Sequence, residues 1–207
     1  MRNIIGFAGK MRCGKGVLSK YLQDKYGYTY IEIAESIKNA CTEMLGLDSV
    51  DELNRLKNSD QKVAIYFNED LCRRFADKLG VEAQYFYVWM HGREITTVRE
   101  LLQTIATDVL RNLDENWHIN KTMDKIIDIV SHGGKVAVAD IRFPNEKAKI
   151  EGVGGEVYYV VRNNGIEHSD HPSENSLSIE DFDDEHVIYN DCDENALIAK
   201  FEKLVNV

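Results

Sequence analysis

The chain has 207 residues, of which 43% are hydrophobic and 29% are charged, and its formal net charge is −10. This length is typical of one globular domain and excludes a peptide too small to bury a core. The 35 acidic against 25 basic residues argue against a nucleic-acid backbone or an anionic membrane as partner, because both attract basic proteins. We expect neither a membrane span nor a leader peptide, since no apolar run is long enough.

Cysteine usage favours a reducing compartment. The four cysteines form no CxxC pair and lie far apart, at Cys13, Cys41, Cys72 and Cys192. We therefore expect a reduced, cytoplasmic protein without structural zinc.

The negative charge is concentrated near the C-terminus. Residues 1–162 contain 23 acidic and 23 basic residues, whereas residues 163–207 contain 12 acidic and 2 basic residues. A long acidic loop is expected over residues 163–185. An anionic ligand should therefore bind to the first 162 residues.

Short apolar runs predict five buried strands, at residues 3–8, 28–33, 135–140, 156–161 and 186–190. After the first strand, apolar residues at helical spacing predict a helix that ends at Gly27. Residues 34–133 are mostly helical in pattern, most clearly at 59–80 and 97–113, and an amphipathic helix is expected over 194–205. Short buried strands that alternate with helices indicate an α/β protein with a parallel sheet.

The segment GKMRCGK, residues 9–15, matches the phosphate-binding pattern GxxxxGK between a predicted strand and a predicted helix. Glycines let backbone amides turn toward phosphate oxygens, and Lys15 would reach the outer phosphates of ATP. The alternative is a plain glycine-rich turn with an incidental lysine. The candidate ATP-binding residues are Gly9, Arg12, Cys13, Gly14, Lys15, Gly16 and Val17.

Gly16 stands where a serine or threonine usually binds Mg²⁺. Either water and carboxylates elsewhere hold the metal, with Asp140 as a candidate through water, or ATP use is impaired. No direct metal ligand is expected. Ser19, further along the helix, is a doubtful substitute for the missing hydroxyl.

The helix predicted over residues 97–113 has one apolar face, formed by Leu102, Ile105, Ala106, Val109, Leu110 and Leu113. Beside this face, polar residues recur every four positions and so advance by about 40° each on an α-helix. This polar stripe is either a nucleotide-binding wall or a solvated helix face. Its members are Arg99, Gln103, Thr107 and Arg111.

Asp140 ends the third predicted strand, at the sheet edge where open α/β sheets bind ligands. Arg142 follows and can bind phosphate bidentately, with Glu146 placed to orient it. The alternative is a structural Asp–Arg pair that closes the strand end. The basic groups expected to converge on this rim are Lys15, Arg99, Arg111 and Arg142.

Further segments occur in a specific order along nearly the whole chain: IAESIK (33–38), TVRELLQTIATDVLR (97–111), ADIRFPNE (139–146), VYYVVR (157–162), HPSENSL (171–177) and VIYND (187–191). With the GxxxxGK loop, they make the sequence resemble a phage-type deoxynucleoside monophosphate kinase of the P-loop nucleoside monophosphate kinase superfamily. Two departures are Gly16-Val17, where family members tend to carry a hydroxyl, and Ala106, where glycine usually precedes Thr107.

The resemblance implies a P-loop kinase three-layer α/β fold with a five-stranded parallel sheet. It implies a single domain, 1–207, with 34–133 as a helical substrate-binding and lid region inserted between core strands. It further implies transfer of the γ-phosphoryl group of ATP, with Mg²⁺, to a deoxynucleoside 5′-monophosphate in the cytoplasm, of the host if phage-encoded. Small nucleotides are the expected partners, and a homodimer is an open alternative to a monomer.

Residue by residue, the resemblance implies that Lys15, Asp140 and Arg142 are catalytic, that Arg162 lies on the ATP side and that Arg99 binds the acceptor phosphate. From the resemblance and the patterns above together, the candidate substrate-binding residues are Met11, Lys38, Arg99, Gln103, Thr107, Arg111, Trp117, Asp140, Arg142, Glu146, His171 and Glu174. Two other functions stay open: another small-molecule kinase of this fold, such as one acting on dephospho-coenzyme A, and a nucleotide-binding module without catalysis.

Overall fold

The computed structural model describes residues 2–59, 61–162, 175–191 and 193–205. The chain divides into two compact units. The first consists of Met1–Ile33 and Ile119–Val207, and the second is Ala34–His118. Each unit has its own buried core and is described by itself.

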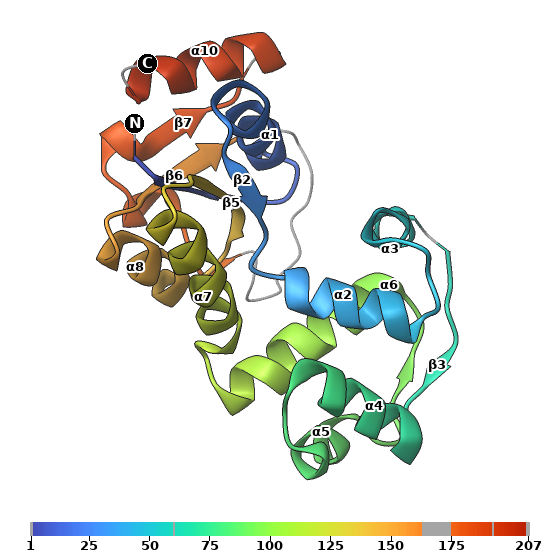
Figure 1. Ribbon diagram of the computed structural model, residues 1–207. Helices are drawn as coiled ribbons and strands as arrows, with labels where there is room; N and C mark the ends of the chain where they lie inside the picture. The colour runs from blue at the N-terminus through green and yellow to red at the C-terminus, as the bar shows by residue number, and fades with distance from the viewer. Residues whose placement is uncertain (1, 60, 163–174, 192, 206–207) are drawn as a thin grey trace. The chain divides into compact units, whose positions relative to one another are not determined.

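The first unit is built on a five-stranded parallel sheet with the strand order β2-β5-β1-β6-β7 (Figure 1). The ends of each strand lie within two residues of the predicted ends. This agreement is expected, because short apolar runs between turns favour buried strands. The strands are β1 (Ile4–Ala8), β2 (Thr29–Ile31), β5 (Val136–Ile141), β6 (Glu156–Val161) and β7 (Val187–Tyr189).

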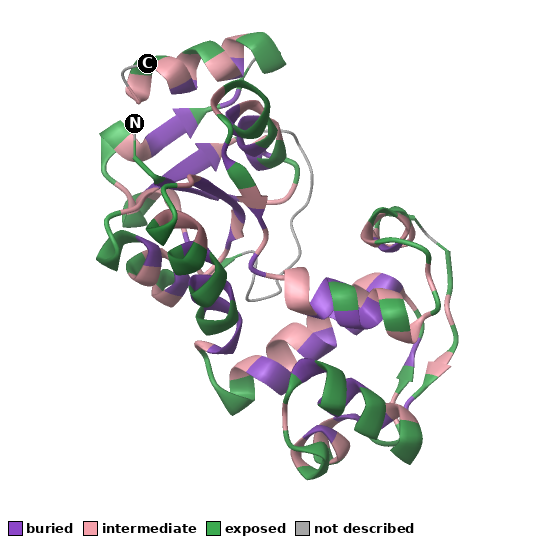
Figure 2. Ribbon diagram, viewed as in Figure 1, coloured by how far each residue is buried: buried purple, intermediate pink, exposed green. Residues whose placement is uncertain are grey.

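All five residues of β1 are buried, and Figure 2 shows the central strands of the sheet mostly in the colour of buried residues. Ile4 and Ala8 belong to the apolar cluster on one face, whereas Ile5 and Phe7 belong to the cluster on the other. A strand that is covered on both faces needs apolar residues at successive positions. This explains why the run reads as continuous rather than alternating.

Four helices cover the two faces of this sheet: α1 (Lys15–Tyr26), α10 (Glu194–Leu204), α7 (Trp117–Ser131) and α8 (Pro144–Gly152). Leu18 of α1 and Phe201 of α10 pack into one cluster, while Ile126 of α7 and Ile150 of α8 pack into the other. The result is three layers, helix–sheet–helix, and the predicted P-loop kinase fold is confirmed. Two short 3-10 turns, η2 (Ile179–Asp181) and η3 (Asp184–His186), precede β7.

The ends of the first and last helices follow local sequence signals. Gly27 ends α1 with a φ of 70°, a left-handed conformation that glycine adopts without a steric penalty. Asp193 caps α10, because its side chain accepts a hydrogen bond from the backbone N–H of Ala196.

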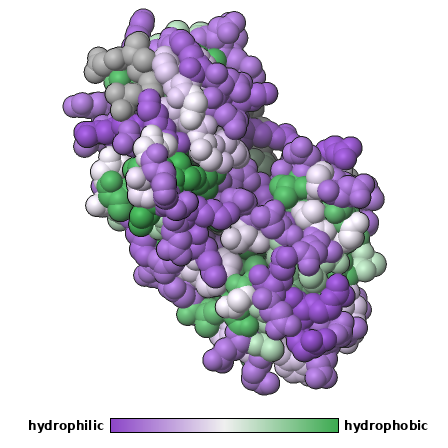
Figure 3. Space-filling view, viewed as in Figure 1, coloured by the Kyte–Doolittle hydropathy of each residue, from purple (hydrophilic) through white to green (hydrophobic). Residues whose placement is uncertain are grey.

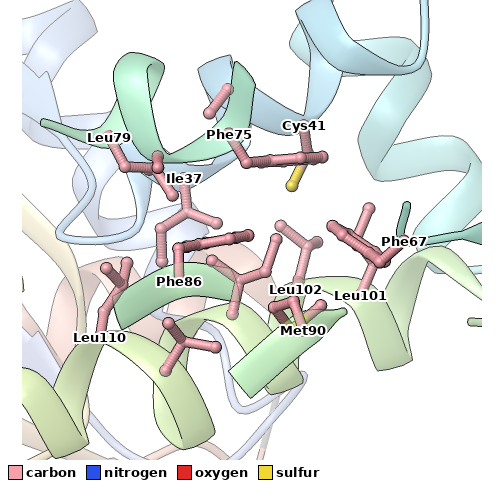
Figure 4. Packing of buried hydrophobic residues seen from close by; sticks show 14 of the residues in the cluster. Ile37, Cys41, Phe67, Phe75, Leu79, Phe86, Met90, Leu101, Leu102 and Leu110 are labelled. Atoms are coloured by element: carbon pink, nitrogen blue, oxygen red, sulfur yellow. The ribbon is translucent and has the colours of Figure 1, made fainter. Parts of the chain in front are cut away.

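The second unit is mainly helical and has a core rich in phenylalanine. The rings of Phe75 and Phe86 stack with centroids 5.9 Å apart, and Phe67 packs against both (Figure 4). Its elements are α2 (Glu35–Met44), α3 (Val50–Lys57), β3 (Ile65–Tyr66), α4 (Glu69–Leu79), α5 (Ala83–Met90), β4 (Glu94–Ile95), α6 (Val98–Gln103) and the π-helix η1 (Thr104–Arg111).

The helix predicted over 59–80 is wrong in its first half. Strand β3 occupies Ile65–Tyr66 and pairs with β4 in an antiparallel ladder. The residues at 63, 65 and 67 are apolar with a period of two, which suits a strand and not a helix. Helix α4 begins only at Glu69, where the Asn68 side chain caps it by accepting from the N–H of Leu71.

The compact helical unit ends at His118, fifteen residues before the end of the predicted insertion 34–133. The reason lies in α7, whose residues Ile119, Met123 and Ile126 follow one another at helical spacing and are buried against the sheet of the first unit. Burial of such side chains contributes roughly 1.5–3 kcal/mol each, so this stretch joins the sheet core.

Within the described residues, no helix is both long and apolar enough to cross a membrane. The face seen in Figure 3 is mostly hydrophilic, and hydrophobic residues appear on it as separate patches.

Candidate functional site

The topology of the first unit changes direction at the carboxyl ends of β1 and β5. These strands are parallel neighbours in the sheet. The chain leaves β1 toward α1 on one face and leaves β5 toward α8 on the other. Adjacent strands whose connections go to opposite faces leave a gap between the two loops, which is where open α/β sheets bind their ligands.

The loop after β1 has a backbone that requires its glycines. Gly9 and Gly14 have φ values of 130° and 114°, and Arg12 between them has a φ of 60°. A Cβ atom on Gly9 would collide with the carbonyl oxygen of Val160, and one on Gly14 would lie 2.7 Å from Nδ2 of Asn190. The conformation and the close packing therefore both exclude side chains at the two ends of the loop.

The Lys15 side chain binds carbonyl groups of this loop. It is the first residue of α1, and its side chain is buried. Its ammonium group donates hydrogen bonds to the carbonyl oxygens of Gly9, at 2.6 Å, and Lys10, at 2.8 Å. The loop is thus held in a ring around a buried cation.

The start of α1 is suited to an anion. Gly14 has no side chain with which to cap the helix, so the amides of the first turn are not occupied by a side-chain cap. The helix macrodipole adds partial positive charge at this end, next to the Lys15 ammonium. Of the remaining predicted ATP-binding residues, Arg12 and Gly16 are exposed, Val17 is half-buried and Cys13 is buried.

Arg142 joins the same loop from β5. Its Nη1 atom donates to the carbonyl oxygen of Gly9 at 3.2 Å, so Lys15 and Arg142 meet at one oxygen atom. Of the four basic residues expected to converge, the structure brings these two together within the first unit. Arg99 and Arg111 belong to the second unit.

Asp140 and Glu146 hold the backbone around Arg142. The Asp140 carboxylate accepts a hydrogen bond of 2.6 Å from the N–H of Ile33, which links the ends of β5 and β2. Glu146 is buried and accepts from the N–H groups of Arg142, at 2.8 Å, and Phe143, at 3.1 Å. Glu146 therefore positions Arg142 through its main chain, as an N-terminal cap of α8.

A second acidic residue lies near Asp140. The Tyr30 hydroxyl donates to the Glu32 carboxylate at 2.7 Å. Burial raises the pKa of Tyr30, and the charges of Glu32 and Asp140 raise it further. The sequence analysis did not identify Glu32, because the predicted strand 28–33 includes this residue, whereas β2 ends before it, at Ile31.

The structure changes the expected polar stripe of the second unit. Arg99, Gln103, Thr107 and Arg111 are all half-buried, but eight residues in the middle of this helix, Thr104–Arg111, form a π-helix. Its i→i+5 hydrogen bonds widen each turn beyond 3.6 residues. Four-residue steps therefore no longer advance as they do on an α-helix, and the predicted 40° slant does not hold in this segment.

The same widening explains an error in the predicted apolar face. Leu113 was expected at its end but is 42% exposed, and Ala106 is only half-buried. Leu101, outside the predicted set, is fully buried instead.

Three side chains donate to carbonyl oxygens of the π-helix: His118 to Ala106 at 2.9 Å, Tyr85 to Val109 at 3.1 Å and Asn112 to Asp108 at 2.8 Å. Each such bond contributes about 1 kcal/mol net. π-Helices are rare and occur often at functional sites. The supported π-helix is therefore a candidate functional segment, and it carries Thr107 and Arg111.

His118 is neutral in this arrangement. Burial and the nearby charge of Arg111 together lower its pKa to about 4, although the bond to Ala106 opposes the shift. Since Nε2 faces a carbonyl oxygen, it must carry the ring proton. The neighbouring Trp117 is also buried and lies edge-on to the His118 ring, with centroids 5.1 Å apart, as part of the second core.

The other predicted substrate-binding residues lie in different environments. The Arg99 guanidinium donates to the carbonyl oxygen of Lys57 and to Oδ1 of Asn58, each at 3.3 Å, at the end of α3. Lys38 is buried in α2, and Met11 is half-buried in the glycine loop. Arg162 is exposed just after β6. His171 and Glu174 lie outside the described residues.

The donor set for a metal is sparse. Among the described residues, no group of three or more His, Cys, Asp or Glu side chains could hold a metal ion. Gly16 has open space where a Cβ would be, and Ser19 is fully buried in α1. The serine therefore does not replace the hydroxyl that is missing after Lys15.

Sequence comparison agrees with the geometry. The sequence model of a family described as "Deoxynucleotide monophosphate kinase" matches residues 52–201. A protein of Acanthamoeba polyphaga mimivirus, named "Putative deoxynucleotide monophosphate kinase", is 26% identical over 191 residues, which cover 87% of this chain and 85% of the viral protein.

Proposed function

Because the chain belongs to the deoxynucleotide monophosphate kinase family, we propose that it transfers the γ-phosphoryl group of ATP to a deoxynucleoside 5′-monophosphate. An oxygen of the acceptor phosphate forms a bond to the γ-phosphorus while the bond from that phosphorus to the β–γ bridging oxygen breaks. The products are a deoxynucleoside diphosphate and ADP.

The observation that carries this proposal is the pair of cations on the Gly9 carbonyl oxygen, Lys15 Nζ at 2.6 Å and Arg142 Nη1 at 3.2 Å. Phosphoryl transfer requires positioning and charge neutralisation more than covalent chemistry. Lys15 and the loop amides would bind the phosphates of ATP. Arg142 would neutralise the migrating group and the acceptor phosphate, and Asp140 and Glu146 would hold the backbone that presents it.

The second unit supplies the remaining part of the proposal. Arg99, Lys38 and Trp117 would contact the acceptor nucleotide, as the family resemblance implies. The half-buried positions Gln103, Thr107 and Arg111 would line the same wall. A rare π-helical backbone supported by three side-chain donors favours this interpretation over an ordinary solvated face.

Mg²⁺ would be bound by the nucleotide phosphates and by water, an arrangement that this ion tolerates well. When bound, it would neutralise charge on the transferred phosphate. Gly16 offers no side-chain ligand, so the protein's part would be limited to a carboxylate, with Asp140 as the candidate, that accepts hydrogen bonds from metal-bound water.

A cytoplasmic location is part of the proposal, because Cys13, Cys41 and Cys72 are free thiols and ATP and deoxynucleotides are found in that compartment.

The test is an ADP-release assay with ATP and Mg²⁺ across the four deoxynucleoside monophosphates, their ribonucleoside counterparts and dephospho-coenzyme A. We expect turnover with at least one deoxynucleoside monophosphate, and a diphosphate product identified by mass spectrometry. Turnover with dephospho-coenzyme A alone would overturn the proposal.

A second candidate, favoured by Gly16, is a nucleotide-binding module without catalysis. It would bind ATP in calorimetry and release no ADP with any acceptor. Measurable turnover in the first assay excludes it.

A further inference from the structure

A buried asparagine that follows the edge strand β7 contacts the glycine loop. Asn190 follows β7 and is 4% exposed. Its backbone N–H donates to the carbonyl oxygen of Val161 at 2.7 Å, which fixes its position beside β6. Its side-chain Nδ2 donates to the carbonyl oxygen of Cys13, also at 2.7 Å, across 177 positions of the sequence.

The direction of this hydrogen bond determines where the next amide points. In a trans peptide, the C=O of one residue and the N–H of the next point in opposite directions, and the described chain contains no cis peptide bond. When Asn190 holds the Cys13 carbonyl toward itself, the N–H of Gly14 must point away from Asn190. Gly14 has a φ of 114° and leaves room for this turn.

Asn190 and Lys15 therefore hold different carbonyl groups of the same loop. Lys15 binds those of Gly9 and Lys10, whereas Asn190 binds that of Cys13. These three carbonyl oxygens are bound to protein donors, so they are not available to repel an anion at the loop.

We propose that Asn190 is a positioning residue of the phosphate-binding loop, which orients the Gly14 N–H toward the phosphates of a nucleoside triphosphate. This inference rests on the proposed function, because it assumes that the loop binds the ATP phosphates. It adds a required residue, Asn190 after the last strand, that the GxxxxGK pattern does not contain.

The chemistry of the side chain is specific. The Nδ2 group must face the Cys13 oxygen, because a flipped amide would place two oxygens against each other. Asn190 Oδ1 is buried and has no hydrogen-bond partner among the residues that the structure describes. Such an atom costs free energy, so the contact with Cys13 has to outweigh that cost. Aspartate has nearly the same shape but no N–H, and leucine has the volume without polar atoms.

The experiment compares Asn190→Asp and Asn190→Leu with a matched control, Ser19→Ala. Ser19 is a fully buried polar residue of α1 whose Oγ has no hydrogen-bond partner within the described part of the chain. Dissociation constants for ATP and for inorganic tripolyphosphate are measured by calorimetry, together with KM for ATP, KM for the acceptor and Tm.

We expect both Asn190 variants to weaken ATP and tripolyphosphate binding by tenfold or more and to raise KM for ATP, while KM for the acceptor stays within twofold. Ser19→Ala should leave both dissociation constants and both KM values within twofold. A purely structural role would lower Tm without changing the affinity of the folded variant, and that result would overturn the inference.

A second measurement does not depend on the stability of the variants. In the wild-type protein labelled with ¹⁵N, the amide signal of Gly14 should shift when tripolyphosphate is added. An unchanged Gly14 signal at saturating ligand contradicts the inference alone. Failure of the wild-type protein to bind either ATP or tripolyphosphate would instead overturn both the inference and the proposed function.

Discussion

The imidazole Nε2 of His118 lies 2.9 Å from the carbonyl oxygen of Ala106, inside the π-helical segment Thr104–Arg111. The ring is 5% exposed, and its neighbour Arg111 ends the same segment. A neutral histidine is thus built into the backbone support of the helix that carries two of the proposed nucleotide-binding residues.

The burial of this ring predicts acid sensitivity. Burial lowers the pKa of His118 from 6.5 to about 4, so between these values the unfolded chain binds a proton that the folded chain does not. The free energy of unfolding should therefore fall as the pH drops from 6.5 to 4, by about 3 kcal/mol in total. Urea unfolding at pH 7.5 and pH 4.5 should show a smaller pH effect in His118→Gln than in the wild type. His132→Gln, at an exposed site, should retain the wild-type effect.

Tyr85→Phe tests the second support of the π-helix. The substitution removes the hydroxyl that donates to Val109 at 3.1 Å, and we expect the free energy of unfolding to fall by about 1 kcal/mol. Tyr66→Phe is the matched control, because Tyr66 is 55% exposed and should change stability by less than about 0.5 kcal/mol. Equal effects from the two substitutions would contradict the assigned role of Tyr85.

Lys15→Ala should abolish measurable turnover and leave the circular dichroism spectrum unchanged. The ammonium that donates to Gly9 and Lys10 is lost, and with it the proposed charge on the ATP phosphates. Lys20→Ala, at an exposed position of the same helix, should keep full activity. Wild-type turnover in the Lys15 variant would remove the loop from the proposed mechanism.

Arg142→Lys should lose at least tenfold in kcat, and Arg142→Ala should abolish turnover, because a lysine cannot reproduce the planar guanidinium fork. The fold should persist in both variants, since Glu146 binds the backbone N–H of residue 142 and not a group removed by the substitution. Arg73→Ala, on the exposed face of α4, serves as the control. Steady-state kinetics with saturating ATP measures the effect.

Gly9→Ala and Gly16→Ala should have opposite effects on stability. A Cβ on Gly9 would collide with the backbone of Val160 at a φ of 130°, so we expect a loss of more than about 2 kcal/mol. Apart from its chain neighbours and the backbone of its own helix, no atom lies within 4 Å of a Cβ on Gly16, which is in the first turn of α1, so alanine there should stabilise by about 0.5–1 kcal/mol. Thermal unfolding of both variants measures the expected loss and gain of stability. A Gly9→Ala variant as stable as the wild type would contradict the described loop conformation.

Local signals in the sequence were enough for most of the first unit. The apolar runs of β1 and β5 are continuous because both faces of these strands are covered, and the glycine pattern of residues 9–15 specifies a turn that other residues cannot adopt. The position of Arg142 two residues after a strand end was also sufficient to place it on the ligand edge of the sheet.

Local signals misled where backbone geometry depends on distant partners. The apolar spacing of residues 97–113 is compatible with an α-helix, and only donors from elsewhere in the fold, Tyr85 and His118, accompany the wider π-helical turn. Similarly, β3 needs β4 as its partner, twenty-eight residues later, and an isolated two-residue strand has no stability of its own.

The sequence by itself determined the α/β class, the five core strands, the glycine-rich turn of residues 9–15 and the end of α1 at Gly27, because each depends on the conformational preferences of neighbouring residues. Tertiary structure alone decided the strand order, the meeting of Lys15 and Arg142 at one carbonyl oxygen, and the contact from Asn190 to Cys13. These contacts join residues up to 177 positions apart. Local conformational preferences do not specify which of many compatible partners comes within hydrogen-bond distance in the folded chain.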